Sequence, residues 1–150
     1  MKKTYLQKGF TLIELLVVIV IISILTAIIT GNLTGSKAKS RDAKRISDIA
    51  QIQLALELFY DRCGIYPPHI DDTTATGNSC DFTLATFISS IPKDPFGSPY
   101  QYMVGTNDYV IRTTFETPNP SIDRFVGTFE GTSGSVNCTN APTDYCVRPF

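Results

Sequence analysis

The chain has 150 residues, of which 43% are hydrophobic and 18% are charged, and its formal net charge is −1. This composition excludes a chain that is disordered throughout, and the nearly neutral charge excludes a general affinity for nucleic acid. The apolar residues are unevenly placed. Residues 10–29 contain a single charged side chain, Glu14, whereas the chain after Ile70 has the composition of a soluble protein. We therefore expect a membrane segment followed by one globular domain.

Residues 1–9, MKKTYLQKG, contain three lysines and no acid, which is typical of a leader held on the cytoplasmic side of a membrane. A helix of twenty residues is about 30 Å long, so residues 10–30 are predicted to span the bilayer. Residues 36–45, SKAKSRDAKR, place five basic side chains on the far side, against the positive-inside rule. We expect these side chains to meet lipid headgroups and water. We do not expect nucleic acid as a partner, although basic clusters also bind phosphates.

No proline occurs between residues 10 and 62, so the helix is predicted to continue through residues 31–62. This half has an apolar stripe that should pack on the chain's own domain, formed by Ile49, Ile52, Leu56, Phe59 and Tyr60. A second stripe indicates either a face toward neighbouring molecules or a helix buried deeply in one domain, and it consists of Ala50, Leu54 and Leu58. Gly31 and Gly35 are predicted to loosen the helix, at about 1 kcal/mol each, with a close helix contact as the alternative.

A small α+β head is predicted after the helix. Gly64 should end the helix, and Asp81 should cap a short helix over residues 82–90. Three segments alternate between apolar and polar residues and predict an antiparallel sheet, namely residues 100–104, 109–116 and 124–130. One face of this sheet should be covered by the amphipathic helix and the other should be wet. Residues 131–150 are rich in Gly, Ser, Thr and Asn and are expected to be irregular.

Four cysteines, Cys63, Cys80, Cys138 and Cys146, all follow the apolar segment. None belongs to a Cys-x-x-Cys pair, and His69 is the only histidine, so no metal site is predicted. If the head is extracytoplasmic, the even count predicts two disulfides. Three connectivities are open, of which we favour the local pairs 63–80 and 138–146, and four buried free thiols are the alternative.

No catalytic set stands out. His69 lies in a Pro-Pro-His turn and is expected to face solvent. The sequence has no glycine-rich phosphate loop, no Ser-His-Asp spacing and no carboxylate pair. We therefore expect a protein that is not an enzyme.

Residues 8–27, KGFTLIELLVVIVIISILTA, closely resemble the leader and N-terminal helix of type IV pilins and type II secretion pseudopilins. In that family a membrane peptidase cuts after the glycine and methylates the new N-terminus. The resemblance implies cleavage after Gly9, methylation of Phe10 and an assembly role for Glu14. The ammonium created at Phe10 could pair with Glu14 of the same chain or of a neighbour, because a matched buried charge is tolerable and an unmatched one is expensive. A carboxylate that reaches the headgroup boundary is the alternative.

Residues 91–104, IPKDPFGSPYQYMV, resemble the loop and first strand of major pseudopilins, which implies a subunit-contact loop. A proline-rigid turn that leads into a strand is the alternative. Many such pseudopilins bind calcium after the sheet, but here that segment offers only the separated acids Asp123, Glu130 and Asp144. We therefore expect no cofactor, with calcium as the alternative. The cysteine-closed tail is more similar to that of type IV pilins.

The resemblance and the patterns together predict a type IV pilin-like α+β fold, in which a long N-terminal helix packs on a small antiparallel sheet. The predicted parts are a leader (1–9), a transmembrane segment (10–30), an amphipathic continuation (31–62) and a head with a disulfide-closed tail (63–150).

We expect a subunit of a homo-oligomeric filament, either a pilus or a type II secretion pseudopilus. Its expected partners are a prepilin peptidase and an inner-membrane assembly platform. It should first lie in the bacterial inner membrane with its C-terminal domain outside, and later in an extracytoplasmic filament. The alternatives are a membrane-anchored binding domain that does not polymerise, a DNA-uptake pseudopilin, and a secreted domain cleaved after the apolar run.

Overall fold

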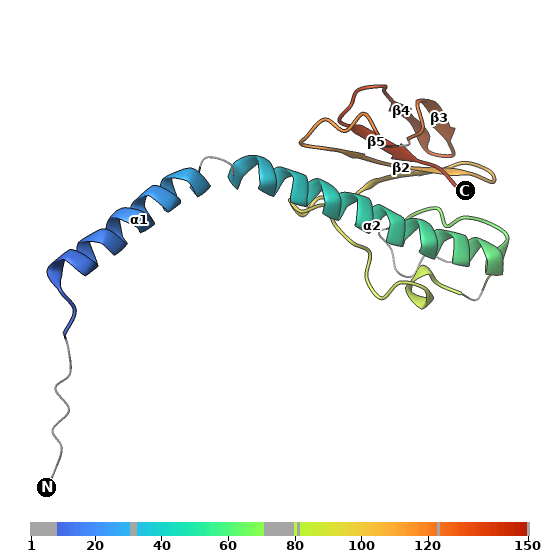
Figure 1. The fold of residues 1–150 in the computed structure, drawn as a ribbon. Coiled ribbons are helices and arrows are strands. Elements are labelled where there is room, and N and C mark those ends of the chain that lie inside the picture. Colours follow the sequence, from blue (N-terminus) through green and yellow to red (C-terminus); the bar gives the residue numbers. More distant parts are fainter. Residues whose placement is uncertain (1–8, 31–32, 71–79, 81, 123, 150) are drawn as a thin grey trace, which may run out of the picture. The chain divides into compact units, whose positions relative to one another are not determined.

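The computed structural model describes residues 9–30, 33–70, 80, 82–122 and 124–149. These residues form two units, divided between Lys37 and Ala38. The helix α1, Leu12–Thr30, lies in the first unit. The helix α2, Leu33–Cys63, begins there and runs through the second unit (Figure 1).

The helix α1 is apolar along almost its whole length, and its large apolar side chains are exposed in the single chain. Its stretch Leu12–Ile29 is long and apolar enough to cross a membrane. The hydroxyls of Ser23 and Thr26 each donate a hydrogen bond of 2.7 Å to a carbonyl oxygen one turn earlier, at Ile19 and Ile22. Both donors are therefore satisfied inside the helix, as a segment surrounded by lipid requires.

The helix α2 buries the first apolar stripe, which confirms that prediction. Four members of the stripe are fully buried, and they are Ile49, Ile52, Leu56 and Phe59. The fifth, Tyr60, packs against this core. Gly64 follows the helix with a φ of +71° and donates its amide to the Tyr60 carbonyl at 2.7 Å, so the predicted glycine stop is also confirmed.

The second stripe of α2 is exposed. Ala50 is open to solvent, and the exposed fractions of Leu54 and Leu58 are 60% and 43%. The alternative that α2 is buried deeply on all sides is therefore wrong. Gly35 lies inside α2, so the predicted loosening is not observed at this glycine, because one glycine costs less than the helix around it gains. Gly31 lies outside the described residues.

The main sheet of the head is antiparallel and has three strands in the order β1-β2-β5. These strands are β1, Gln101–Val104, β2, Tyr109–Thr114, and β5, Asp144–Val147. Tyr109 and Ile111 of β2 and Tyr145 of β5 pack in one core with the buried stripe of α2. Figure 1 shows α2 lying across this face of the sheet.

A two-stranded hairpin covers part of the opposite face. It consists of β3, Gly127–Gly131, and β4, Gly134–Cys138. Val110 of the main sheet is buried together with Phe129 of the hairpin. Gly131 is required at the crossing, because a Cβ there would lie 2.8 Å from the carbonyl oxygen of Val104.

Three predictions about the head are wrong. The tail is not irregular, because residues 131–150 supply β4 and β5. The third predicted strand forms as β3 but pairs with β4 in a separate sheet and not with β2. The outer face of the main sheet is not wholly wet, because the hairpin covers Val110. Alternation of apolar residues could not reveal a sheet partner whose strands are mostly polar.

The predicted helix over residues 82–90 is also wrong. The described residues there form a single 3₁₀ turn, Leu84–Thr86. Thr83 precedes this turn with an extended backbone and no side-chain capping bond, and Asp81 lies outside the described residues. So short a segment does not offset the cost of starting a helix.

Candidate assembly interface

The predicted processing residues lie just before α1. Gly9 and Phe10 are outside the helix, and Phe10 is 92% exposed. Among the described residues, apart from Gly9 and its chain neighbours, no atom lies within 4 Å of the position that a Cβ of Gly9 would occupy. The peptide bond between these residues is therefore open to a peptidase in the single chain.

Glu14 is bound by Thr11 at the start of α1. Its Oε2 accepts hydrogen bonds from the Thr11 amide at 2.8 Å and from the Thr11 hydroxyl at 2.7 Å. In return, the Glu14 amide donates to Thr11 Oγ1 at 3.3 Å. This reciprocal pattern is a capping box, in which two side chains satisfy amides that the first helical turn leaves unpaired. The Thr-x-x-Glu signal is visible in the sequence, although the capping box was not predicted from it.

Because Glu14 caps the helix of its own chain, its position does not by itself indicate a role in assembly. A carboxylate offers about four lone-pair sites, and the two bonds from Thr11 both go to Oε2. The group therefore keeps acceptor capacity for a cation while it caps the helix. An ammonium at Phe10 would be such a cation, and the helix start would not have to open to receive it.

A buried guanidinium connects α2 to two other segments of the head. The side chain of Arg45 is 3% exposed and donates to Asp42 at 2.6 Å, to Asp94 at 2.6 Å and to Glu116 at 3.0 Å. Asp94 precedes β1 and Glu116 follows β2, so one side chain joins three parts of the chain. The bond that Arg45 donates to Asp94, together with those to the two other carboxylates, raises the pKa of Arg45 despite its burial.

Asp42 and Arg41 extend this network. Asp42 accepts the amides of Glu116 and Thr117 at 2.9 Å each, and the Thr117 hydroxyl at 2.6 Å. Burial alone would raise the pKa of Asp42, but these bonds and Arg45 hold it below its ordinary value. Arg41 donates two bonds to Glu116, at 2.6 and 2.5 Å. Bonds from Arg41 and then Arg45 lower the pKa of Glu116 to about 2.

These contacts change the interpretation of the basic segment 36–45. Arg41 and Arg45 bind acids of the head, and Lys44 pairs with Asp48 at 2.6 Å. Three of the five basic residues are thus committed to carboxylates of the same chain. The segment therefore has less positive charge to offer a phosphate backbone than its sequence suggests.

A second polar cluster, which is partly buried, was also not predicted. The hydroxyls of Tyr66 and Tyr109 each donate to the Glu57 carboxylate at 3.1 Å. Burial, and then the neighbouring Glu57, raises the pKa of Tyr66 to about 12. The cluster supplies partners for polar groups at the edge of the core, as buried polar atoms require.

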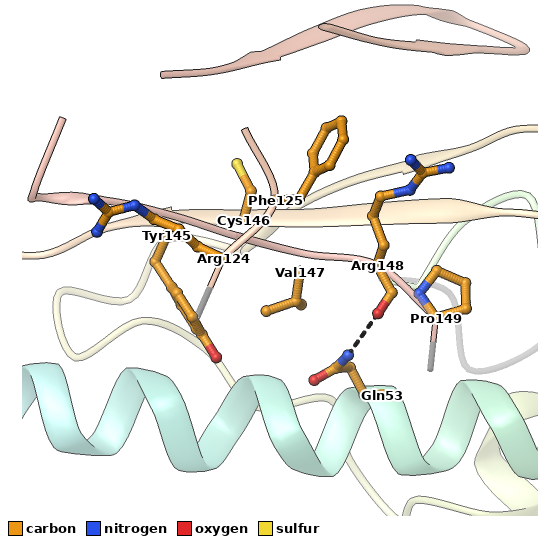
Figure 2. A pocket seen from close by; sticks show the side chains of 8 residues that line it. All are labelled: Gln53, Arg124, Phe125, Tyr145, Cys146, Val147, Arg148 and Pro149. Carbon is orange, nitrogen blue, oxygen red and sulfur yellow. Dashed lines mark hydrogen bonds between the residues drawn. The ribbon is translucent and has the colours of Figure 1, made fainter. Parts of the chain in front are cut away.

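An open pocket of about 500 Å³ lies between α2 and the end of β5 (Figure 2). Gln53 of α2 donates to the Arg148 carbonyl at 3.0 Å. Both arginines that line the pocket already have partners in the chain. Arg124 donates to the Asn119 carbonyl at 3.1 Å, and Arg148 pairs with Asp108. The eight described residues that line the pocket include no carboxylate, histidine or free thiol, so it offers no general base.

The structure joins Cys63 to Cys80 at the end of α2, and Cys138 to Cys146 between β4 and β5. These are the local pairs that the sequence favoured. His69 is exposed, as predicted.

The acids of the tail are not gathered at one point. Asp144 is bound by Arg112 at 2.8 Å and by the Thr139 amide at 2.7 Å, Glu130 is exposed, and Asp123 lies outside the described residues. Within the described ranges, no three His, Cys, Asp or Glu side chains are grouped to hold a metal ion.

Comparison with known proteins separates the two parts of the chain. Residues 5–30 match the prokaryotic N-terminal methylation motif, and residues 32–113, more than half of the chain, match the model of type II secretion system (T2SS) protein G. The chain belongs to the type II secretion system protein G family.

Several relatives named type II secretion system core protein G are identical to this chain at about one third of the aligned positions. The type II secretion system core protein G of Vibrio cholerae is 36% identical over 69% of this chain and 75% of its own length. The proteins of the same name from Aeromonas hydrophila and Escherichia coli K12 are 35% and 33% identical. They cover 65% and 67% of this chain, and 73% and 74% of their own lengths. No solved structure gives a significant match.

The protein G match ends at residue 113, inside β2. It includes α2, β1 and the loop that contains Asp94, but not Glu116 or the strands β3 to β5. The Cys138–Cys146 disulfide therefore lies in a part of the chain that the family model does not cover.

Proposed function

We propose that this chain is a structural subunit of a type II secretion pseudopilus, cleaved after Gly9, methylated at Phe10 and assembled through its N-terminal helix. The observation that carries the proposal is the succession of two matches along one chain, the methylation motif and then the protein G domain. The geometry at α1 supports it, because Glu14 caps the helix and still has acceptor capacity for the new chain end. The proposal includes no catalytic activity and no cofactor.

We propose that the subunit is anchored in the bacterial inner membrane before assembly, with its head outside the cytoplasm. The length and apolarity of α1 support the anchoring. The two disulfides support an oxidising compartment for the head. The proposed partners are a prepilin peptidase, an inner-membrane assembly platform and further copies of the chain. The division into 1–9, 10–30, 31–62 and 63–150 is part of this proposal.

The experiment that tests the proposal is N-terminal sequencing with mass spectrometry of the chain, taken from membranes and from sheared filaments. We expect N-methylated phenylalanine, Phe10, as the first residue. An intact Met1 would instead support a membrane-anchored domain, and a start beyond Ala27 a secreted one. Gly9→Leu is the matched control. This substitution replaces the residue before the cut and should therefore block cleavage. Because the space around Gly9 is open, it should not disturb the fold.

A further inference from the structure

One exposed aromatic ring of the head is held in a fixed position. Phe96 is 68% exposed, and its amide donates to Asp94 Oδ1 at 2.9 Å. Gly97 follows with a φ of +89° and closes the turn by donating to the Asp94 carbonyl at 2.7 Å. The guanidinium carbons of Arg41 and Arg45 lie 5.3 and 5.6 Å from the centroid of the ring. Cation–π contacts and the turn thus fix a side chain that belongs to neither hydrophobic core of the described head.

A second exposed apolar surface lies further along α2. It is the row Ala50, Leu54 and Leu58, which we call the α2 ridge. Its members are four residues apart, so their side chains lie above one another on one side of the helix. Covering exposed leucines of this kind with a partner stabilises the complex by about 25 cal/mol for each Å² of apolar surface removed from water. No segment of the described head covers the ridge.

We propose that the Phe96 ring of one subunit docks on the α2 ridge of another subunit of the filament. This inference rests on the proposed function, because a filament supplies identical copies in a repeating order. The residues that hold Phe96 precede Leu54 by about two to four helical turns, which is about 14–20 Å along α2. A copy that lies beside the ridge and is shifted along α2 by about that distance would present its ring to the ridge of its neighbour. Since ring and ridge are different surfaces, the contact is heterologous and can repeat without closing.

Charge and composition favour a second copy as the occupant. Interface cores are enriched in aromatic and arginine side chains and depleted of unpaired charge. The arginines beneath Phe96 are already paired with Asp94 and Glu116, so docking would bury no unmatched cation. The ridge itself contains no charged or polar side chain. It is also part of the helix through which the subunits are proposed to assemble, so the contact would continue that interface.

The test uses full-length copies in filaments that wild-type subunits help to form. Phe96→Cys copies and Leu54→Cys copies are expressed together with wild type, and sheared filaments are oxidised and analysed by mass spectrometry. We expect a disulfide-linked dimer between the two substituted positions, present in the filament fraction and absent from the membrane fraction. The matched control replaces Phe96→Cys by Phe82→Cys, which alters another exposed aromatic residue, 43% exposed. This pair should give no such dimer.

Filaments that form but lack the crosslink would overturn the docking while leaving the proposed function intact. A crosslink of equal yield in the membrane fraction would also overturn it, because the contact would then not depend on the filament. Failure of wild-type copies to form any filament would count against the proposed function instead.

Phe96→Ala gives a second measurement. Loss of an aromatic hot spot weakens a contact about thirtyfold, so filament yield should fall, whereas the subunit should stay folded and lose only the stability of its two cation–π contacts. Normal yield from this variant would contradict the docking.

Discussion

At the scale of single residues, Glu14 combines two tasks that need different chemistry. Capping of α1 needs only an acceptor oxygen for the amide and hydroxyl of Thr11. Pairing with an ammonium at Phe10 needs a negative charge. Glutamine can occupy the same position of a capping box but has no charge, so Glu14→Gln separates the two tasks.

We predict that Glu14→Gln is inserted and cleaved like wild type but forms filaments at least tenfold less efficiently. An ammonium left without its counter-charge in a buried bundle costs about 3–5 kcal/mol. Immunoblots of sheared and membrane fractions measure both outcomes. Thr11→Val is the control, because it removes a capping hydroxyl and retains the charge, at about 1 kcal/mol of helix stability. Normal filaments from Glu14→Gln would show that the carboxylate acts as a cap and not as a counter-ion.

The candidate site was only partly predictable from single residues. Gly9, Phe10 and Glu14 lie within one short motif, so neighbouring letters were enough to find them. The partners of Arg45 could not be found in this way, because Asp94 and Glu116 are 49 and 71 residues away. The local spacing does not mark Arg45 as the basic residue of this segment that the fold buries, while Lys37 and Lys39 stay exposed.

At the scale of elements, periodicity decided what could be predicted. Leu56 and its neighbours repeat at helical spacing, and Tyr109 and Ile111 alternate, so α2 and β2 could be located from the sequence. The strand β4 has one partly buried apolar side chain, Val136, and therefore gives no such signal. It depends instead on the hairpin turn at Gly134, whose φ is +137°, and on the covalent bond of Cys138 to β5.

The two disulfides should therefore differ in importance. Chain entropy alone gives about 3 kcal/mol for each, slightly more for the longer 63–80 loop. Cys138 and Cys146 are fully buried against Val110, whereas Cys63 and Cys80 are only partly buried. We predict that Cys138→Ala/Cys146→Ala lowers the free energy of unfolding by more than Cys63→Ala/Cys80→Ala, because it also removes packed sulfur atoms.

Urea unfolding of the purified full-length variants in detergent, followed by near-ultraviolet circular dichroism, measures this order. An equal or reversed loss would show that loop length outweighs burial. Thiol labelling of unfolded wild type is the control for the bonds themselves. It should detect four reactive groups only after reduction, and four groups before reduction would contradict both disulfides.

At the scale of the whole head, Arg45 is the point where α2, the loop before β1 and the end of β2 are joined. Removing its charge leaves Asp42 and Asp94 largely buried without their shared cation. We predict that Arg45→Met lowers the free energy of unfolding at neutral pH by about 3–5 kcal/mol. Lys39→Met, which makes the same replacement at an exposed position, should change it by less than about 0.5 kcal/mol.

The same network predicts how the stability of the head depends on pH. Burial raises the pKa of Asp42 and of Asp94, but hydrogen bonds and Arg45 outweigh it and hold both below their ordinary value. Bonds from Arg41 and Arg45 lower the pKa of Glu116 to about 2. The folded head thus binds fewer protons than the unfolded chain. Its extra stability is present above about pH 4.5 and is lost as the pH falls toward about 2.

In Arg45→Met the pKa of each of these acids should rise toward its ordinary value. The variant should therefore lose less folding stability than wild type as the pH falls. We therefore expect the difference in unfolding free energy between wild type and Arg45→Met to be largest near pH 7 and to shrink as the pH falls from about 4.5 to about 2. Urea titrations across this range, with Lys39→Met in parallel, measure the difference. A difference that stays constant with pH would show that Arg45 stabilises the head through the packing of its aliphatic stem and not through its bonds to the carboxylates.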